Sequence, residues 1–169
     1  MRSLIATALI FCCGICSAED LPENANEIKA LTAEEAAYLV ATFEGEFLFL
    51  NGVASIDKDT AQELAKVEGG LSLGLTSIDK DVAKELAKSR AWVLTLSSLT
   101  SIDKDVAQKL AKLMGNLELN GLTSVDKDVA QELAKFNGWL TLNGLTSIDK
   151  DVLPILKSNP KISFPQKKN

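Results

Sequence analysis

The sequence predicts an α/β solenoid, in which short parallel strands alternate with helices along a stack of similar units. The main observation is an internal repeat, because a Leu-x-Leu pair recurs every 23 residues. These pairs are Leu48/Leu50, Leu71/Leu73, Leu94/Leu96, Leu117/Leu119 and Leu140/Leu142. Self-similarity at a period of about 20–50 residues is typical of solenoids. The second observation is that each unit carries a strand pattern and then a helix pattern, separated by turn residues.

The unit at 117–139 shows how each element is predicted. Period-two alternation of apolar residues at 117–119 indicates a strand, and Asn-Gly at 120–121 indicates a turn. Asp126 is suited to cap a helix. The apolar face of that helix is formed by Val129, Ala130, Leu133 and Ala134. Asn-Gly at 137–138 then ends it.

Repetition of this unit predicts the shape of the stack. Helices pack about 8–10 Å apart, whereas neighbouring strands lie about 4.8 Å apart. A stack with strands on one side and helices on the other must therefore bend. We expect the parallel strands on the concave face and the helices on the convex face.

The chain divides into five segments on composition. Residues 1–18 are predicted to be a signal peptide and residues 19–30 a polar linker. Residues 31–46 are expected to form an N-terminal capping helix, opened by a Thr32/Glu35 capping box. Residues 47–164 are assigned to the solenoid, as five repeats and a final strand. Residues 165–169 are a polar tail.

The first segment predicts export to the periplasm or the exterior. Met1-Arg2-Ser3 is a short basic start, an apolar run of about 13 residues follows, and Cys16-Ser17-Ala18 is a small-residue cleavage pattern. A membrane span needs about 20 apolar residues. We therefore expect cleavage after Ala18 and no stable membrane insertion afterwards, with an uncleaved anchor as the alternative.

Composition excludes several classes of function. All three cysteines (Cys12, Cys13, Cys16) lie in the signal segment, and the chain has no histidine. The formal net charge is −5, without a basic stripe, so no nucleic-acid partner is expected. With neither thiol nor imidazole available after residue 18, the sequence predicts that the protein is not an enzyme and uses no cofactor.

Five Asp-Lys-Asp triplets are interpreted as helix starts. The aspartates are Asp57/Asp59, Asp79/Asp81, Asp103/Asp105, Asp126/Asp128 and Asp149/Asp151. A row of carboxylates holding Ca²⁺ is the alternative, but a lysine inside each pair neutralises the row. No metal site is expected.

The unit L-x-L-N-G-L-T-S-I-D-K-D-V-A-x-x-L-A-K resembles a leucine-rich repeat over roughly residues 31–164. It is most similar to the cysteine-containing subtype, with the cysteine position taken here by Val53, Leu75, Leu99, Leu122 and Leu145. The resemblance implies a short bacterial exported form of that fold. Better-known members carry a further domain that recruits ubiquitin-transfer machinery, and no part of this chain matches it.

Candidate binding residues lie in columns on the expected concave face, because residues two apart in a strand face the same way. The candidates are Phe47, Phe49, Val93, Thr95, Asn116, Glu118, Asn120, Trp139, Thr141 and Asn143. Phe47, Phe49 and Trp139 are the large anchors. In the alternative interpretation, the two phenylalanines pack under the N-terminal segment and Trp139 only covers its neighbours. Trp92 is interpreted as a hydrophobic plug, with an exposed contact as its alternative.

These features favour a non-enzymatic exported binding or scaffold module that recognises a protein or a glycan. The alternative is a structural envelope protein that self-associates end to end, through a final edge strand at 162–164.

Overall fold

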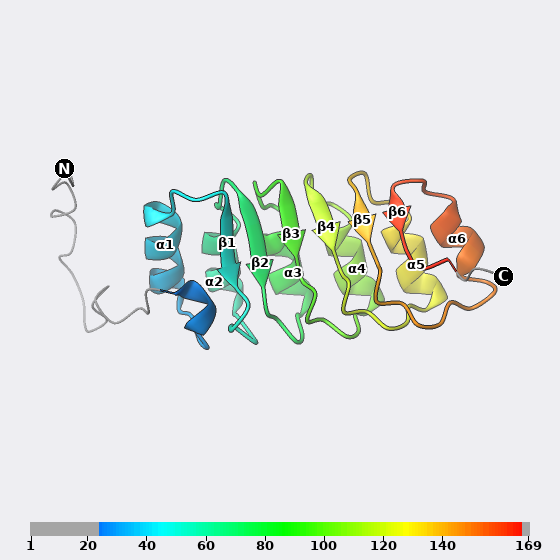
Figure 1. Cartoon of the computed structure of the whole chain (residues 1–169), viewed down its shortest axis with the longest axis horizontal. Helices are drawn as coiled ribbons and strands as arrows, with labels where there is room; N and C mark the ends of the chain where they lie inside the picture. The colour runs from blue at the N-terminus through cyan, green and yellow to red at the C-terminus, as the bar shows by residue number, and fades with distance from the viewer. Residues whose placement is uncertain (1–23, 167–169) are drawn as a thin grey trace, which may run out of the picture.

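The computed structural model describes residues 24–166, which alternate strands with helices (Figure 1). A 3-10 helix η2 (Ala25–Glu27) and a helix α1 (Ala33–Thr42) come first. The repeats follow as β1 (Phe47–Leu50), α2 (Lys58–Leu64), β2 (Gly70–Leu73), α3 (Lys80–Leu86), β3 (Val93–Thr95), α4 (Lys104–Leu110), β4 (Asn116–Glu118), α5 (Lys127–Leu133), β5 (Leu140–Thr141), α6 (Leu153–Lys157) and β6 (Ile162–Ser163). The expected signal peptide, 1–18, and most of the tail lie outside the described residues.

All six strands form one parallel sheet in chain order, from β1 to β6. Phe47 pairs with Gly70, Gly70 with Val93 and Val93 with Asn116, so the register advances 23 residues at each step from β1 to β4. The predicted α/β class, with parallel strands joined through helices, is confirmed. Equivalent positions of successive units therefore stand side by side in columns.

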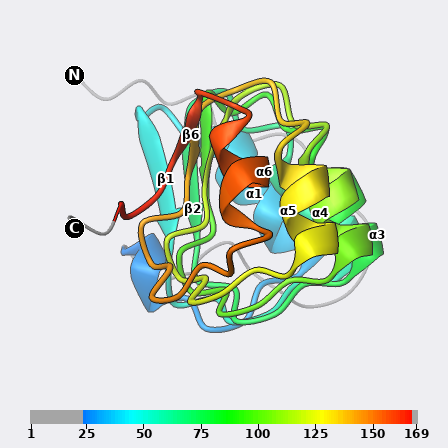
Figure 2. The same cartoon turned by 90° about the vertical axis from the view of Figure 1, so that its right-hand side faces the viewer.

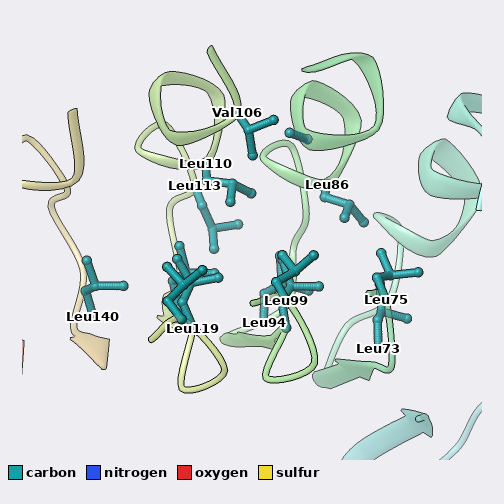
Figure 3. Packing of buried hydrophobic residues seen from close by; sticks show 14 of the residues in the cluster. Leu73, Leu75, Leu86, Leu94, Leu99, Val106, Leu110, Leu113, Leu119 and Leu140 are labelled. Carbon is teal, nitrogen blue, oxygen red and sulfur yellow. The ribbon is translucent and has the colours of Figure 1, made fainter. Parts of the chain in front are cut away.

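The helices cover only one face of this sheet, and the core lies between the two layers (Figure 2). Each Leu-x-Leu pair points into this core, and Leu50, Leu71 and Leu94 have no exposed surface. Leucines from successive units lie in rows between strand and helix (Figure 3). Each unit thus buries its apolar side against its neighbours, as expected for a repeat stack.

Aspartate caps start the repeated helices, as predicted. The carboxylates of four N-cap residues accept backbone N–H groups in the first turn, namely Asp57, Asp79, Asp103 and Asp126. The hydrogen bond from the Thr60 N–H holds the pKa of Asp57 below its usual value. In the last unit, Asp149 contributes only its carbonyl, which accepts the N–H groups of Val152 and Leu153 at 3.0 Å. Helix α6 therefore begins without a side-chain cap.

The N-terminal end is closed by α1 and by the turn before it. The predicted capping box is present, with the Thr32 N–H donating to Glu35 Oε2 at 2.8 Å. Helix α1 packs beside α2 at the end of the helical layer (Figure 1). Within the segment expected to be a linker, Ile28 is buried and Asn26 Oδ1 accepts the Asn51 N–H at 3.0 Å. Residues 24–30 therefore pack against the first unit.

Over residues 24–166, no helix has the length and apolar character needed to cross a membrane.

Removal of one cap is expected to destabilise the stack. Asp103→Ala deletes the acceptor of the Val106 N–H, which lies 2.8 Å from Asp103 Oδ1. The free energy of unfolding should fall by about 1 kcal/mol, measured by urea denaturation. Asp149→Ala is the matched control, because its side chain caps no helix and the loss should be much smaller. Equal losses in both variants would contradict the capping account.

Acid should weaken the helical layer partly through Glu85. Its side-chain hydrogen bond with Lys88 lowers the pKa of this buried carboxyl, against the opposing effect of burial. The resulting stability is present above the unfolded-state pKa, about 4.3, and is lost as pH falls through the lower folded pKa. Glu85→Gln should therefore flatten the acid limb of a stability-versus-pH series. Glu44→Gln, at an exposed position that forms no ion pair with the described residues, should leave it unchanged.

Candidate functional site: a hollow on the open face of the sheet

The face of the sheet away from the helices is called the open face here. Side chains alternate between the two faces along each strand, and β1 shows this clearly. Leu48 and Leu50 are buried toward the helices, whereas Phe47 and Phe49 are exposed on the open face. The same register brings one open-face residue from each neighbouring strand into line with them.

The open face contains a hollow of about 390 Å³ that spans β1 to β5. Aromatic residues form its two ends, and small or polar residues form its floor. It is lined by Phe47, Phe49, Ser72, Trp92, Val93, Thr95, Asn116, Leu117, Glu118, Trp139 and Thr141.

An aromatic cluster of Phe47, Phe49 and Trp92 forms one end of the hollow. The Phe47 and Phe49 rings stack at 5.5 Å between centroids, with planes 11° apart. Phe47 also meets Trp92 edge to face at 4.7 Å. A Cβ at Gly70 would overlap the Phe47 ring, so the absence of a side chain there lets the ring lie across β2. Residues 24–46 leave both phenylalanines more than a third exposed.

The interpretation of Trp92 as a buried plug is wrong, because its side chain is 52% exposed. The segment between α3 and β3 is one residue longer than its equivalents in the adjoining units. Part of this longer segment is buried beneath Trp92, on the side of the core. Ser89 and Ala91 are buried, and the Ala91 N–H donates to Ser89 Oγ at 3.0 Å. With that inner space filled by small residues, Trp92 turns out onto the open face.

Trp139 forms the opposite end, just before β5, and is 61% exposed. Its backbone N–H donates to Asn116 Oδ1 at 3.1 Å. A main-chain N–H can only donate, so the side-chain oxygen of Asn116 must be the atom that faces Trp139. The NH₂ group of Asn116 therefore points away from the Trp139 backbone. The bond ties the strand that carries Trp139 to the floor of the hollow.

The floor between these ends is polar and contains one carboxylate. Thr95 Oγ1 donates to Glu118 Oε2 at 3.2 Å, which joins β3 to β4. Val93 is only 7% exposed and forms a packed part of the floor. Thr141 Oγ1 is buried and has no hydrogen-bond partner among the described residues. Glu118 Oε1 likewise receives no donor from residues 24–166.

The structure brings eight of the ten candidate residues together at the hollow and places two elsewhere. Asn120 and Asn143 lie in the turns after β4 and β5. Asn120 Oδ1 accepts the Asn143 N–H at 3.0 Å, and Asn143 Oδ1 accepts the Ser163 hydroxyl at 3.4 Å. These amides connect successive turns, so their immediate contribution is to the stack.

Sequence reasoning left Trp92, Ser72 and Leu117 out of the candidate set. Ser72 stands in the same column as Phe49 and Thr95, so the register alone would have included it. Trp92 has a weaker signal. The equivalent positions in both adjoining units are glycines, Gly69 and Gly115, and a large side chain between two such positions has open space on each side.

The chemistry of the hollow suits binding. Its lining offers aromatic faces, one carboxylate, the Thr95 hydroxyl and the Asn116 NH₂ group, which together provide apolar contact and hydrogen bonds. Across the described residues, no group of three or more His, Cys, Asp and Glu side chains converges on a point that could hold a metal ion.

Comparison with known proteins gives no further lead. A scan of the chain against models of protein families finds no match, and a search of curated proteins finds no similar sequence.

The aromatic cluster should behave as an energetically coupled unit. In a double-mutant cycle, Phe47→Ala and Trp92→Ala should show a coupling of about 0.5–1.5 kcal/mol in the free energy of unfolding. Phe47→Ala with Trp139→Ala is the matched pair without ring contact, and its effects should add. Additive effects in the first cycle would contradict the edge-to-face contact.

Proposed function

We propose that this protein is a non-enzymatic binding module of the leucine-rich-repeat type, which holds a segment of a partner protein in the hollow. The observation that supports this most is the exposure of aromatic residues at both ends of one concavity. Phe47, Phe49, Trp92 and Trp139 are all more than a third exposed, whereas the repeated leucines are buried.

The exposed aromatic surface argues for a ligand on energetic grounds. Burying apolar surface contributes about 25 cal/mol per Å², so four exposed rings forgo a sizeable contribution to folding. Aromatic residues are also enriched among the side chains that dominate protein interfaces. Gathered around one hollow, these rings are better explained by a partner than by the needs of the fold.

The proposed setting is outside the cytoplasm, where the pattern at residues 1–18 would direct the chain. A partner in the periplasm or the exterior is therefore proposed. A glycan is the second ligand class that the aromatic faces could stack on, and the experiment below separates it from a protein.

End-to-end self-association is a weaker proposal, because the two edge strands of the sheet are poorly suited to pair with another copy. The outer strand β6 has only two residues and is followed by Pro165, which has no N–H to donate. At the other end, the Asn51 N–H is already taken by Asn26. Short and partly occupied edges offer little backbone for pairing with another copy.

Site-directed photo-crosslinking in the cells that make the protein tests the proposal. A photo-reactive phenylalanine analogue at Ser97, which is exposed in the turn after β3 and follows Thr95 of the lining by two residues, should capture a distinct protein partner. The same analogue at Gln108, exposed on α4, is the matched control and should not capture it. Trp139→Ala should abolish the Ser97 product. Identical products from both positions, or a product unaffected by Trp139→Ala, would contradict binding in the hollow.

A further inference from the structure

We infer that the hollow recognises a lysine or arginine side chain presented by an extended protein segment. This inference rests on the proposed function and adds the chemical class of the ligand. It follows from the position of the Glu118 carboxylate between two aromatic ends, in a lining that contains no basic residue.

Glu118 is the only ionisable residue in the lining of the hollow. Its Oε2 receives the Thr95 hydroxyl at 3.2 Å, and its Oε1 has no donor from residues 24–166. An ionised carboxylate only accepts hydrogen bonds, so Oε1 is available for a donor carried by a ligand. A cationic donor gives the stronger, charge-assisted form of this bond.

The aromatic ends select the same ligand charge. The faces of tryptophan and phenylalanine rings attract ammonium and guanidinium groups through the ring quadrupole. An anionic ligand would meet these faces and the Glu118 carboxylate together, and both would repel it. The lining thus offers a cation two kinds of attraction, whereas an anion would meet only uncharged donors, such as the Asn116 NH₂ group and the indole N–H groups.

Two basic residues in neighbouring loops have partners of their own. Arg90 pairs with Glu68 at 3.2 Å, beside the loop that carries Trp92. Lys161 donates to the Asn137 carbonyl at 2.7 Å, beside β6. Neither is part of the lining, and none of the ion pairs formed among residues 24–166 includes Glu118.

Glu118 lies between the strands that follow the two tryptophans. Trp92 immediately precedes β3 and Trp139 immediately precedes β5, so the backbones of the two residues are two strands apart. Glu118 is on β4, one strand from each. A long side chain entering between the indoles would bring its charged end to the carboxylate. The Asn116 NH₂ group lies in the same lining, available to a ligand carbonyl.

The donor set does not suit a metal cation. Calcium takes about six to eight oxygen ligands, and the lining supplies one carboxylate surrounded by rings and aliphatic groups. An organic cation needs fewer ligands, because its apolar stem gains from contact with the rings. A protein side chain is therefore the better fit.

The test uses four glycine-flanked pentapeptide amides that differ only in the central residue, which is lysine, arginine, glutamine or glutamate. Cellobiose represents a glycan. Binding to the purified chain is followed by amide and indole shifts in ¹H–¹⁵N spectra at millimolar ligand. We expect the lysine and arginine peptides to shift the indole N–H signals of Trp92 and Trp139, with weaker or no effect from the others.

Variants then identify the group responsible. Glu118→Gln keeps the size of the side chain and should lower the affinity for the lysine peptide about tenfold. Asp105→Asn, exposed at the start of α4, makes the same charge change away from the hollow and should have no effect. Trp139→Ala should weaken all binding in the hollow.

The outcomes separate this inference from the proposed function. Equal binding of the glutamine peptide, binding of cellobiose alone, or no effect of Glu118→Gln would each overturn cation recognition while leaving the hollow as a binding site. Absence of shifts at the hollow with every peptide would also overturn it, and the crosslinking experiment would then decide the proposed function by itself. Shifts that depend on protein concentration without ligand would point to a second copy and overturn the inference.

Discussion

The rest of the structure depends on the parallel register that places residues 23 apart on neighbouring strands. Once Phe47 pairs with Gly70 and Gly70 with Val93, every strand position is fixed relative to its equivalents in the neighbouring strands. The Leu-x-Leu pairs then meet in rows, and the helices that follow must lie on the same side to cover them. A slip of one residue would turn each leucine to the open face. Burial of the leucines therefore holds the register, and the register holds the columns of the open face.

This constraint explains why the open face tolerates large changes of side chain from one unit to the next. Toward the helices, a changed side chain would leave a cavity or a clash in a packed core, at a cost of a few kcal/mol. On the open face, the column beginning at Phe47 runs through glycine and valine to asparagine without altering the strand pairing, and Trp139 follows at the equivalent position just before β5. The hollow arises from this freedom, since small side chains between large ones leave space above the sheet.

The sequence was sufficient to predict the features that repeat. The parallel α/β arrangement, the leucine core and the Asp126 cap all follow from residues that recur in several units. Each of these units predicts the same local structure independently. The turn of Trp92 onto the open face could not be predicted, because it depends on whether Trp92 or the small residues Ser89 and Ala91 fill the space beneath the longer loop. Asp149 differs from its equivalents for a reason that is visible in the sequence. It has the same sequence context as its equivalents, but Pro154 and the shortened α6 remove the helix start it would cap.

Glu118 illustrates how such a scaffold can acquire specificity at little cost to stability. In its column the residues are Phe49, Ser72, Thr95, Glu118 and Thr141, so one unit has placed a carboxylate where its neighbours have hydroxyls. The charge remains partly exposed and receives the Thr95 hydroxyl, which limits the desolvation cost that a fully buried carboxylate would carry. The backbone beneath it belongs to the same ladder as every other unit. Ligand chemistry on the open face can therefore change by single substitutions, while the leucine rows on the opposite face keep the strands in register.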